Sequence, residues 1–197
     1  ETDLSLDTLD RGKFKKITGF DFLNEILEGI DLCIKLKIPL KINTVILKGI
    51  NDDEIFDLIE FLGEKGIQVR FIEYMPLSGN DNWKEFFISK KEIIEKIKEK
   101  YDIFYHEKEK IAEYYIILNN DKKFVAKVGF ISTITEPFCD YCSRLRITSD
   151  GNMVLCLFDK RGYNLKDFLR PKIREKELFD FILKIVKLKP EGFISLK

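Results

Sequence analysis

The sequence predicts an α/β fold, and three observations support this. Amphipathic helical segments alternate with short β-branched segments up to about residue 75, the pattern of βαβ units in a parallel sheet. The composition, 45% hydrophobic and 35% charged over 197 residues, is that of one globular domain or one and a half. After Leu77 the pattern changes to a helix, a hairpin and further helices. We therefore expect a partial α/β array over residues 1–78 and an α+β region over residues 79–197.

Each expected element rests on periodicity or on a boundary residue. Residues 20–38 carry apolar side chains at helical spacing, and Pro39 ends that helix. Gly49 and Asn51 form a turn before a second helix, which Gly66 ends. Residues 119–121, Asn-Asn-Asp, indicate a hairpin turn. The remaining expected elements are the end of a strand at 5–8, strands at 40–47, 68–75, 114–118 and 124–130, and helices at 89–100, 163–170 and 177–188.

Charge and composition exclude some classes of protein. Lys and Arg together number 34 and so do Asp and Glu, so overall basicity gives no support for a nucleic-acid-coating protein. No apolar run approaches the roughly 20 residues that cross a bilayer, and the first residues are not a secretory signal. We therefore expect a cytoplasmic protein without a membrane span.

Polar residues interrupt two strands that a buried parallel sheet would keep apolar. Lys41 and Asn43 alternate with Ile42 and Thr44, and Arg70 precedes Phe71. One interpretation is a barrel interior or mouth that holds an anionic ligand. The other is an exposed sheet edge with solvated side chains.

Three of the four cysteines lie close together in the sequence, at Cys139, Cys142 and Cys156. Asp150-Gly151 predicts a hairpin turn that brings Cys156 back beside Cys142. With a two-residue turn, Cys156 would lie opposite Leu145, away from the Arg144 and Arg146 side, unless a bulge shifts the register. Three thiolates suit an iron–sulfur cluster or zinc.

The sequence does not decide which residue, if any, would be the fourth ligand of such a site. His106, the only histidine, could complete a structural zinc knuckle, while Cys33 lies on a helical core stripe. Three protein ligands would instead leave an open coordination position for substrate or water. Arg144 and Arg146, two residues apart on a strand, could donate together to phosphate oxygens or could form a solvated edge.

Several motifs together resemble the GTP 3',8-cyclases, the radical S-adenosylmethionine enzymes that begin molybdenum cofactor biosynthesis. The resemblance covers nearly the whole chain, in order. The motifs are Ser5-Leu-Asp-Thr-Leu, Lys41-Ile-Asn-Thr-Val, Lys48-Gly-Ile-Asn, Arg70-Phe-Ile-Glu-Tyr-Met-Pro, Gly129-Phe-Ile-Ser, and Phe138-Cys-Asp-Tyr-Cys-Ser-Arg-Leu-Arg-Ile-Thr-Ser-Asp-Gly with Cys156-Leu-Phe.

The resemblance implies a fold and a set of site residues. The first part would be the later half of an incomplete (β/α) radical-SAM barrel, and the rest would carry the second iron–sulfur cluster. The implied roles are a [4Fe-4S] cluster on Cys139, Cys142 and Cys156, GTP contacts from Lys41, Arg70, Arg144, Leu145 and Arg146, and S-adenosylmethionine contacts from Ser5 and Met75. No catalytic residue is assigned.

The implied reaction cyclises GTP to 3',8-cyclo-7,8-dihydro-GTP. It needs S-adenosylmethionine, two [4Fe-4S] clusters and an electron donor, and its product would pass to cyclic pyranopterin monophosphate synthase. The C-x3-C-x2-C motif of the first cluster is not in this sequence, so we expect a fragment that is inactive alone, with one cluster, as a monomer or homodimer. The alternatives are another radical S-adenosylmethionine enzyme with an auxiliary cluster, or a zinc-containing module whose Lys-rich helix at 90–100 binds nucleic acid.

Overall fold

A computed structural model describes residues 2–77, 82–139, 142–159 and 161–189. The chain forms two compact units. Unit 1 comprises Glu1–Met75 and Asn82–Glu136, and unit 2 comprises Pro76–Asp81 and Pro137–Lys197. The division differs from the expected one, because residues 82–136 complete the sheet of unit 1; the boundary expected between residues 78 and 79 itself lies outside the described residues.

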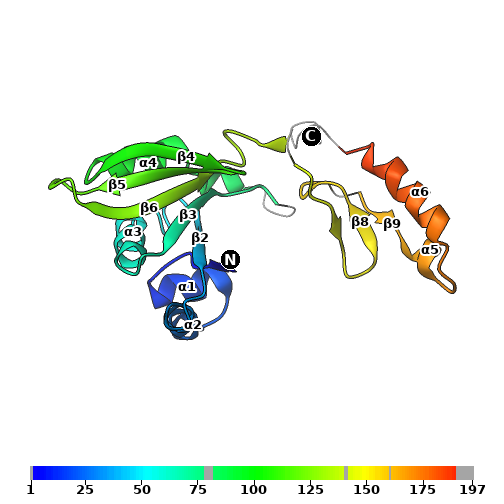
Figure 1. Cartoon of the computed structure of the whole chain (residues 1–197), viewed down its shortest axis with the longest axis horizontal. Helices are drawn as coiled ribbons and strands as arrows, with labels where there is room; N and C mark the ends of the chain where they lie inside the picture. Colours follow the sequence, from blue (N-terminus) through cyan, green and yellow to red (C-terminus); the bar gives the residue numbers. More distant parts are fainter. Residues whose placement is uncertain (1, 78–81, 140–141, 160, 190–197) are drawn as a thin grey trace. The chain divides into compact units, whose positions relative to one another are not determined.

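Unit 1 is built on a six-stranded mixed sheet with the order β1-β2-β3-β6-β5-β4 (Figure 1). The first four strands in this order are parallel, β5 pairs antiparallel with β6, and β4 pairs antiparallel with β5. The α/β class is therefore confirmed. The strand expected at 124–130 is β6, which pairs with β5 as the hairpin predicts and also pairs parallel with β3. The strands are β1 (Thr2–Ser5), β2 (Leu40–Ile46), β3 (Gln68–Glu73), β4 (Asp102–Glu109), β5 (Ala112–Leu118) and β6 (Phe124–Ile131).

Local sequence signals explain where the helices of unit 1 begin and end. Asp10 caps the first helix by accepting from the Lys13 backbone N–H, and Ser89 forms a capping box with Glu92. The helices are α1 (Arg11–Thr18), α2 (Leu23–Lys35), α3 (Ile55–Glu64) and α4 (Lys90–Lys98), with a short 3-10 helix η1 (Trp83–Glu85).

One hydrophobic core joins the sheet and helices of unit 1. Helix α3 packs against β3 and β6, burying Leu58 and Leu62 completely (Figure 1). Strand residues Val69 and Val128 meet in register in the same core. This leaves the other face of the sheet for polar side chains.

The outer edge of the sheet is β4, which the sequence did not predict as a strand. Its pairing with β5 shifts register between Tyr105 and Glu107, so His106 sits at a β-bulge. Few apolar residues follow Tyr105 in this strand, and its Glu-Lys-Glu run is typical of a solvated edge.

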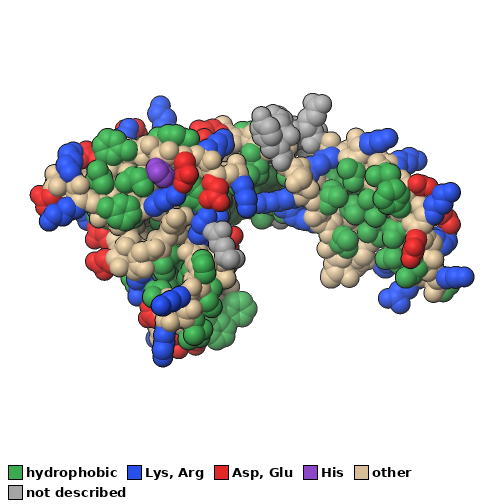
Figure 2. Space-filling model, in the orientation of Figure 1, with side chains coloured by type: hydrophobic (Ala, Val, Ile, Leu, Met, Phe, Trp, Pro, Cys, Tyr) green, Lys and Arg blue, Asp and Glu red, His purple; other side chains and the backbone are tan. Residues whose placement is uncertain are grey.

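Unit 2 is small. Its sheet has the order β7-β8-β9, with antiparallel pairs, and its core consists of Met153, Leu155, Leu165 and Ile185. Hydrophobic side chains also gather on the surface shown for this unit (Figure 2). The elements are β7 (Arg146–Ile147), β8 (Asn152–Val154), β9 (Tyr163–Asn164), α5 (Lys166–Leu169) and α6 (Glu175–Val186). The helix expected at 163–170 is wrong in its first part, because Tyr163 and Asn164 pair with β8 as a strand.

None of the helices in the described part of the chain is long and apolar enough to cross a membrane.

Candidate functional site

A group of cations lies on the polar face of the sheet in unit 1. Arg70 Nε donates to Asn43 Oδ1 at 2.8 Å, and Lys41 and Lys127 both lie over the ring of Tyr114, at 5.4 Å and 4.7 Å from its centroid. Three adjacent strands carry these cations, since β3 lies between β2 and β6. We call Lys41, Arg70 and Lys127 the basic sheet face.

Carboxylates at the rim balance this face. Asp3 bonds Arg70 at 2.5 Å, Glu109 bonds Lys41 at 3.2 Å and Glu107 bonds Lys127 at 2.6 Å. The cationic side chains are only 13–20% exposed, whereas the three carboxylates are 46–54% exposed. The carboxylates therefore have more freedom to turn into solvent than the cations, which are held by packing.

Burial lowers the pKa of the Arg70 guanidinium, but the hydrogen bond and charge of Asp3 outweigh it and raise that pKa overall. Arg70 therefore stays charged beside any anion. The packing needs a glycine, because a Cβ on Gly129 would lie 2.9 Å from both Arg70 Cγ and Tyr114 Cε1. The interpretation of these strands as an exposed sheet edge is therefore wrong for Arg70, because β3 is an interior strand flanked by β2 and β6.

Ser5 and Met75 lie at the same edge of the sheet. Ser5 is the last residue of β1, and Met75 follows β3 by two residues. Because the strands are parallel, their carboxyl ends meet at one edge, where α/β proteins usually bind ligands.

Glu73 ties three segments together at this edge. Its buried carboxylate, 2% exposed, accepts from the backbone N–H groups of Lys90 (3.1 Å), Ile134 (2.9 Å) and Thr135 (2.9 Å), and from the Thr135 hydroxyl (2.5 Å). The last two residues belong to the loop between β6 and Pro137, which leads into the cysteine segment. We call Glu73 and its donors the Glu73 hub.

The side chain of Lys90, whose backbone N–H belongs to the Glu73 hub, contacts two further carboxylates. Its ammonium bonds Glu113 at 2.5 Å and Glu136 at 3.0 Å. Burial opposes the charge of Lys90, but hydrogen bonds to Glu113 and Glu136 raise its pKa well above the ordinary value, and the same contact lowers the pKa of Glu113. Residues 134–136 are therefore held by both a buried carboxylate and a buried ammonium.

The three clustered cysteines all belong to unit 2, as half-buried free thiols. The Cys142 backbone N–H donates to the Cys139 carbonyl at 3.0 Å. In the hairpin, Arg146 pairs with Val154 and Ile147 with Met153. This register is one residue off that of the expected two-residue turn, in which Cys156 would lie opposite Leu145.

The physical reason for this correction is a three-residue turn. Thr148 N–H bonds the Asn152 carbonyl, and Gly151 between them adopts φ +79°, a conformation that glycine allows without strain. Directly opposite residues share a face of a hairpin. Val154 thus lies on the face of Arg146, while Met153 and Leu155 belong to the small core.

Arg144 is exposed and Arg146 half-buried, and Leu145 is 39% exposed. No salt bridge joins either guanidinium to another residue that the structure describes. The pair therefore offers donors to an external anion.

The fit of a metal to the three thiols depends on the kind of centre. Among the described residues, no three His, Cys, Asp or Glu side chains converge closely enough to hold a metal ion. An iron–sulfur cluster attaches each thiolate to a different iron, so its ligands stand farther apart than those of one ion. Three thiols are a donor set that an iron–sulfur cluster, or a zinc ion with one further ligand, would use. His106 lies in unit 1, with Nε2 3.5 Å from Glu107, and Cys33 lies half-buried on α2.

The lysines of α4 do not form a free basic stripe. Lys90, Lys96 and Lys98 each form an ion pair with a carboxylate, and so does Lys100 just after the helix. Such pairing disfavours the nucleic-acid-binding interpretation, which needs exposed cations for phosphates.

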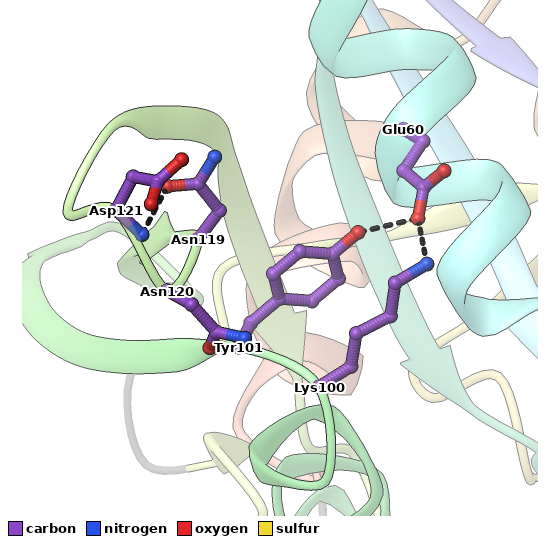
Figure 3. Close-up of a pocket in the computed structure, with 6 residues that line it drawn as sticks. All are labelled: Glu60, Lys100, Tyr101, Asn119, Asn120 and Asp121. Carbon is purple, nitrogen blue, oxygen red and sulfur yellow. Dashed lines mark hydrogen bonds and ion pairs between the residues drawn. The ribbon is translucent and has the colours of Figure 1, made fainter.

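A pocket of about 500 Å³ lies elsewhere on unit 1, lined by α3, the start of β4 and the β5–β6 turn (Figure 3). Tyr101 and Lys100 both bond Glu60 within it. Residues 119–121 line its other side, at the amino end of β6 and therefore at the opposite end of the parallel strands from Glu73. Within it, Glu60 and Lys100 form an ion pair with each other.

The sequence interpretation missed three residues around these sites. Lys127 carried a usable signal, a lysine in the middle of an otherwise apolar strand, the same signal that identified Lys41 and Arg70. Glu73 carried the same signal, as a charge in the expected strand 68–75, but its partners lie far along the chain. Lys189 carried no local signal; it bonds the Arg144 carbonyl at 2.6 Å.

The chain was compared with known proteins. It matches the Molybdenum Cofactor Synthesis C family over residues 67–194. It is 39% identical to a GTP 3',8-cyclase of Thermodesulfovibrio yellowstonii, covering 96% of this chain and 59% of that protein. It is 38% and 41% identical to the molybdenum cofactor biosynthesis protein 1 of Drosophila melanogaster and of Dictyostelium discoideum, covering 91% of this chain and 32% and 29% of those proteins.

The chain thus spans between about a third and three fifths of the length of these relatives. The family match includes β3, the Glu73 hub and all three clustered cysteines, whereas Ser5 and Lys41 precede it. Because the match extends over more than half of the chain, the chain belongs to the Molybdenum Cofactor Synthesis C family.

Proposed function

We propose that this chain is the substrate-binding part of a GTP 3',8-cyclase, which cyclises GTP at the start of molybdenum cofactor biosynthesis. The relatives named GTP 3',8-cyclase support the reaction class. The observation that supports this assignment of the site is the hairpin register, in which Arg146 pairs with Val154. Extended by two residues, this register would bring Cys156 to the face of Arg144 and Arg146. A metal-ligating group beside paired guanidiniums suits a ligand with a coordinating base and a phosphate tail.

In this proposal the four parallel strands are the later part of an incomplete (β/α) radical-SAM barrel. Cys139, Cys142 and Cys156 would hold the second [4Fe-4S] cluster, and the first would belong to sequence outside this chain. Ser5 and Met75, at the carboxyl edge of the sheet, would contact S-adenosylmethionine. When bound, these cofactors supply the one-electron chemistry that removes hydrogen from C3' of the ribose.

The residues of the chain itself bind and orient the substrate. Lys41, Arg70, Arg144 and Arg146 would donate charge-assisted hydrogen bonds to the triphosphate, and we add Lys127 to this set on its geometry. Leu145 would contribute an apolar contact. Holding both ends of GTP keeps C3' and C8 in reacting geometry, which contributes several kcal/mol to catalysis in well-oriented reactions.

The cytoplasmic location, the electron donor, the monomeric or homodimeric state and transfer of the product to cyclic pyranopterin monophosphate synthase belong to the same proposal. They follow from the family resemblance.

GTP binding to the anaerobically reconstituted chain tests the proposal. We expect Lys127→Met and Arg146→Met each to weaken binding roughly 10- to 100-fold, since a hydrogen bond to a charged group contributes about 1.5–3 kcal/mol. Lys123→Met is the matched control, because Lys123 is exposed at the turn before the same strand. Equilibrium dialysis with labelled GTP measures the affinities.

The bound metal is measured on the same samples. Broad iron–sulfur absorbance with about four iron atoms per chain supports the proposal, whereas one zinc per chain contradicts it. Equal affinities for GTP in wild type and in both variants would also contradict it.

A further inference from the structure

Lys189 connects the end of α6 to the cysteine segment of unit 2. Its ammonium donates to the Arg144 carbonyl at 2.6 Å and lies 3.7 Å from Cys142 Sγ, within hydrogen-bonding reach for sulfur. The residue is half-buried, and its own backbone N–H bonds the Val186 carbonyl at 3.1 Å.

These contacts hold the ammonium in a defined place. Helix α6 is anchored by Ile185, which is 2% exposed in the small core beside Met153 and Leu155. Lysine has three donors and no acceptor, so the Arg144 carbonyl can fix one N–H while another points to the sulfur. A positive charge is thereby kept beside Cys142.

We propose that Lys189 is a positioning residue that donates a hydrogen bond to the Cys142 thiolate and raises the reduction potential of the cluster bound there. This inference rests on the proposed function, because it needs the cluster on Cys139, Cys142 and Cys156. Through the Arg144 carbonyl, the same ammonium also fixes the backbone of the phosphate-binding segment relative to the cluster ligand.

The electrostatic reason is direct. One-electron reduction adds a negative charge to the cluster, and no bond to the protein forms or breaks. A nearby fixed cation and a hydrogen bond to a ligand sulfur both stabilise the reduced form. Removing them disfavours reduction.

The test uses the 197-residue chain, reconstituted anaerobically with iron and sulfide. It carries one group of three clustered cysteines, so its spectrum reports a single cluster. The midpoint potential is measured by electron paramagnetic resonance during titration with dithionite. The variants are Lys189→Met, which removes charge and donors, Lys189→Gln, which keeps a neutral donor, and Lys189→Arg, which keeps both. Lys187→Met is the matched control, since Lys187 is exposed two residues away.

We expect Lys189→Met to lower the ratio of reduced to oxidised cluster about tenfold at a fixed potential, which is about 59 mV for one electron. Lys189→Gln should give a smaller shift in the same direction, and Lys189→Arg and Lys187→Met should stay near wild type. If Lys189→Met fails to hold a cluster, the inference is tested by the midpoint potentials of the other two variants. We then expect Lys189→Gln to have a lower midpoint potential than Lys189→Arg.

Equal potentials in wild type, Lys189→Gln and every variant that holds a cluster would overturn the inference and leave the proposed function intact. A shift in Lys187→Met as large as that in the Lys189 variants would also overturn it. A wild-type chain that takes up no iron–sulfur cluster under these conditions would overturn both.

Discussion

The Glu73 hub gives the sharpest prediction about stability. A carboxylate only accepts hydrogen bonds, and all four of its partners donate, so the site matches an ionised glutamate. In Glu73→Gln the better orientation puts the amide nitrogen at the Oε1 position, because the Thr135 hydroxyl there can turn and accept. The Lys90 backbone N–H is then left without an acceptor in a buried place.

The magnitude follows from these contacts. One unsatisfied buried donor costs about 1–3 kcal/mol, and the other bonds lose the charge that strengthens them, so Glu73→Gln should lower the free energy of unfolding by about 2–3 kcal/mol. Glu73→Ala leaves three backbone donors unpaired and should lower it by about 3–5 kcal/mol. We expect the loss of free energy of unfolding to increase with the number of backbone donors that are left without an acceptor.

Urea denaturation measures both variants. Trp83, the only tryptophan, lies in unit 1 beside α4, so its fluorescence reports the unfolding of the unit that contains the hub. Glu99→Gln, at an exposed glutamate after the same helix, is the control and should stay within about 0.5 kcal/mol of wild type. A Glu73→Gln chain as stable as this control would refute the reasoning.

Three further predictions concern packing, pH and metal. Gly129→Ala should destabilise the chain by about 1–3 kcal/mol in urea and weaken GTP binding, while Gly29→Ala, in open space on α2, should stabilise it by about 0.5–1 kcal/mol; equal effects would contradict the packing argument. The hydrogen bond from Lys90 holds the pKa of Glu113 below its ordinary 4.5. The stabilisation from this pair is therefore fully present above about pH 4.5 and is lost as the pH falls through the lower pKa of the folded state. Urea midpoints between about pH 7 and pH 3 should therefore fall less steeply in Lys90→Met, and unchanged steepness would count against the pair. Cys156→Ser should lose most of the iron bound on reconstitution, and full iron content would remove this residue from the ligand set.

Local patterns were sufficient for much of unit 1. The helix over 20–38 and the strand over 40–47 are confirmed as α2 and β2, because apolar spacing and Pro39 act within a few residues. The Asn-Asn-Asp hairpin is confirmed as β5 and β6 for the same reason. What the sequence could not show is that β6 pairs with β3, since that pairing joins residues about sixty positions apart.

The candidate site was likewise predicted only in part from the sequence. Lys41 and Arg70 were identified because a charge in an apolar strand is a local anomaly. The sequence left the register of the hairpin before Cys156 undecided, because that register depends on whether the turn at Gly151 has two or three residues. The structure has a three-residue turn. Their assigned roles in binding GTP and a cluster stay predictions until the binding experiments are done.

The bulge at His106 has a consequence for how this protein behaves at high concentration. An outer strand presents unpaired backbone groups to which a second molecule could add its own strand and begin a growing aggregate. In β4 the shifted register interrupts that template, and the alternating charges of residues 107–109 would repel or misalign an identical neighbour. Straightening this edge by deleting His106 would therefore favour intermolecular β-assembly, even though β4 itself would remain well paired with β5.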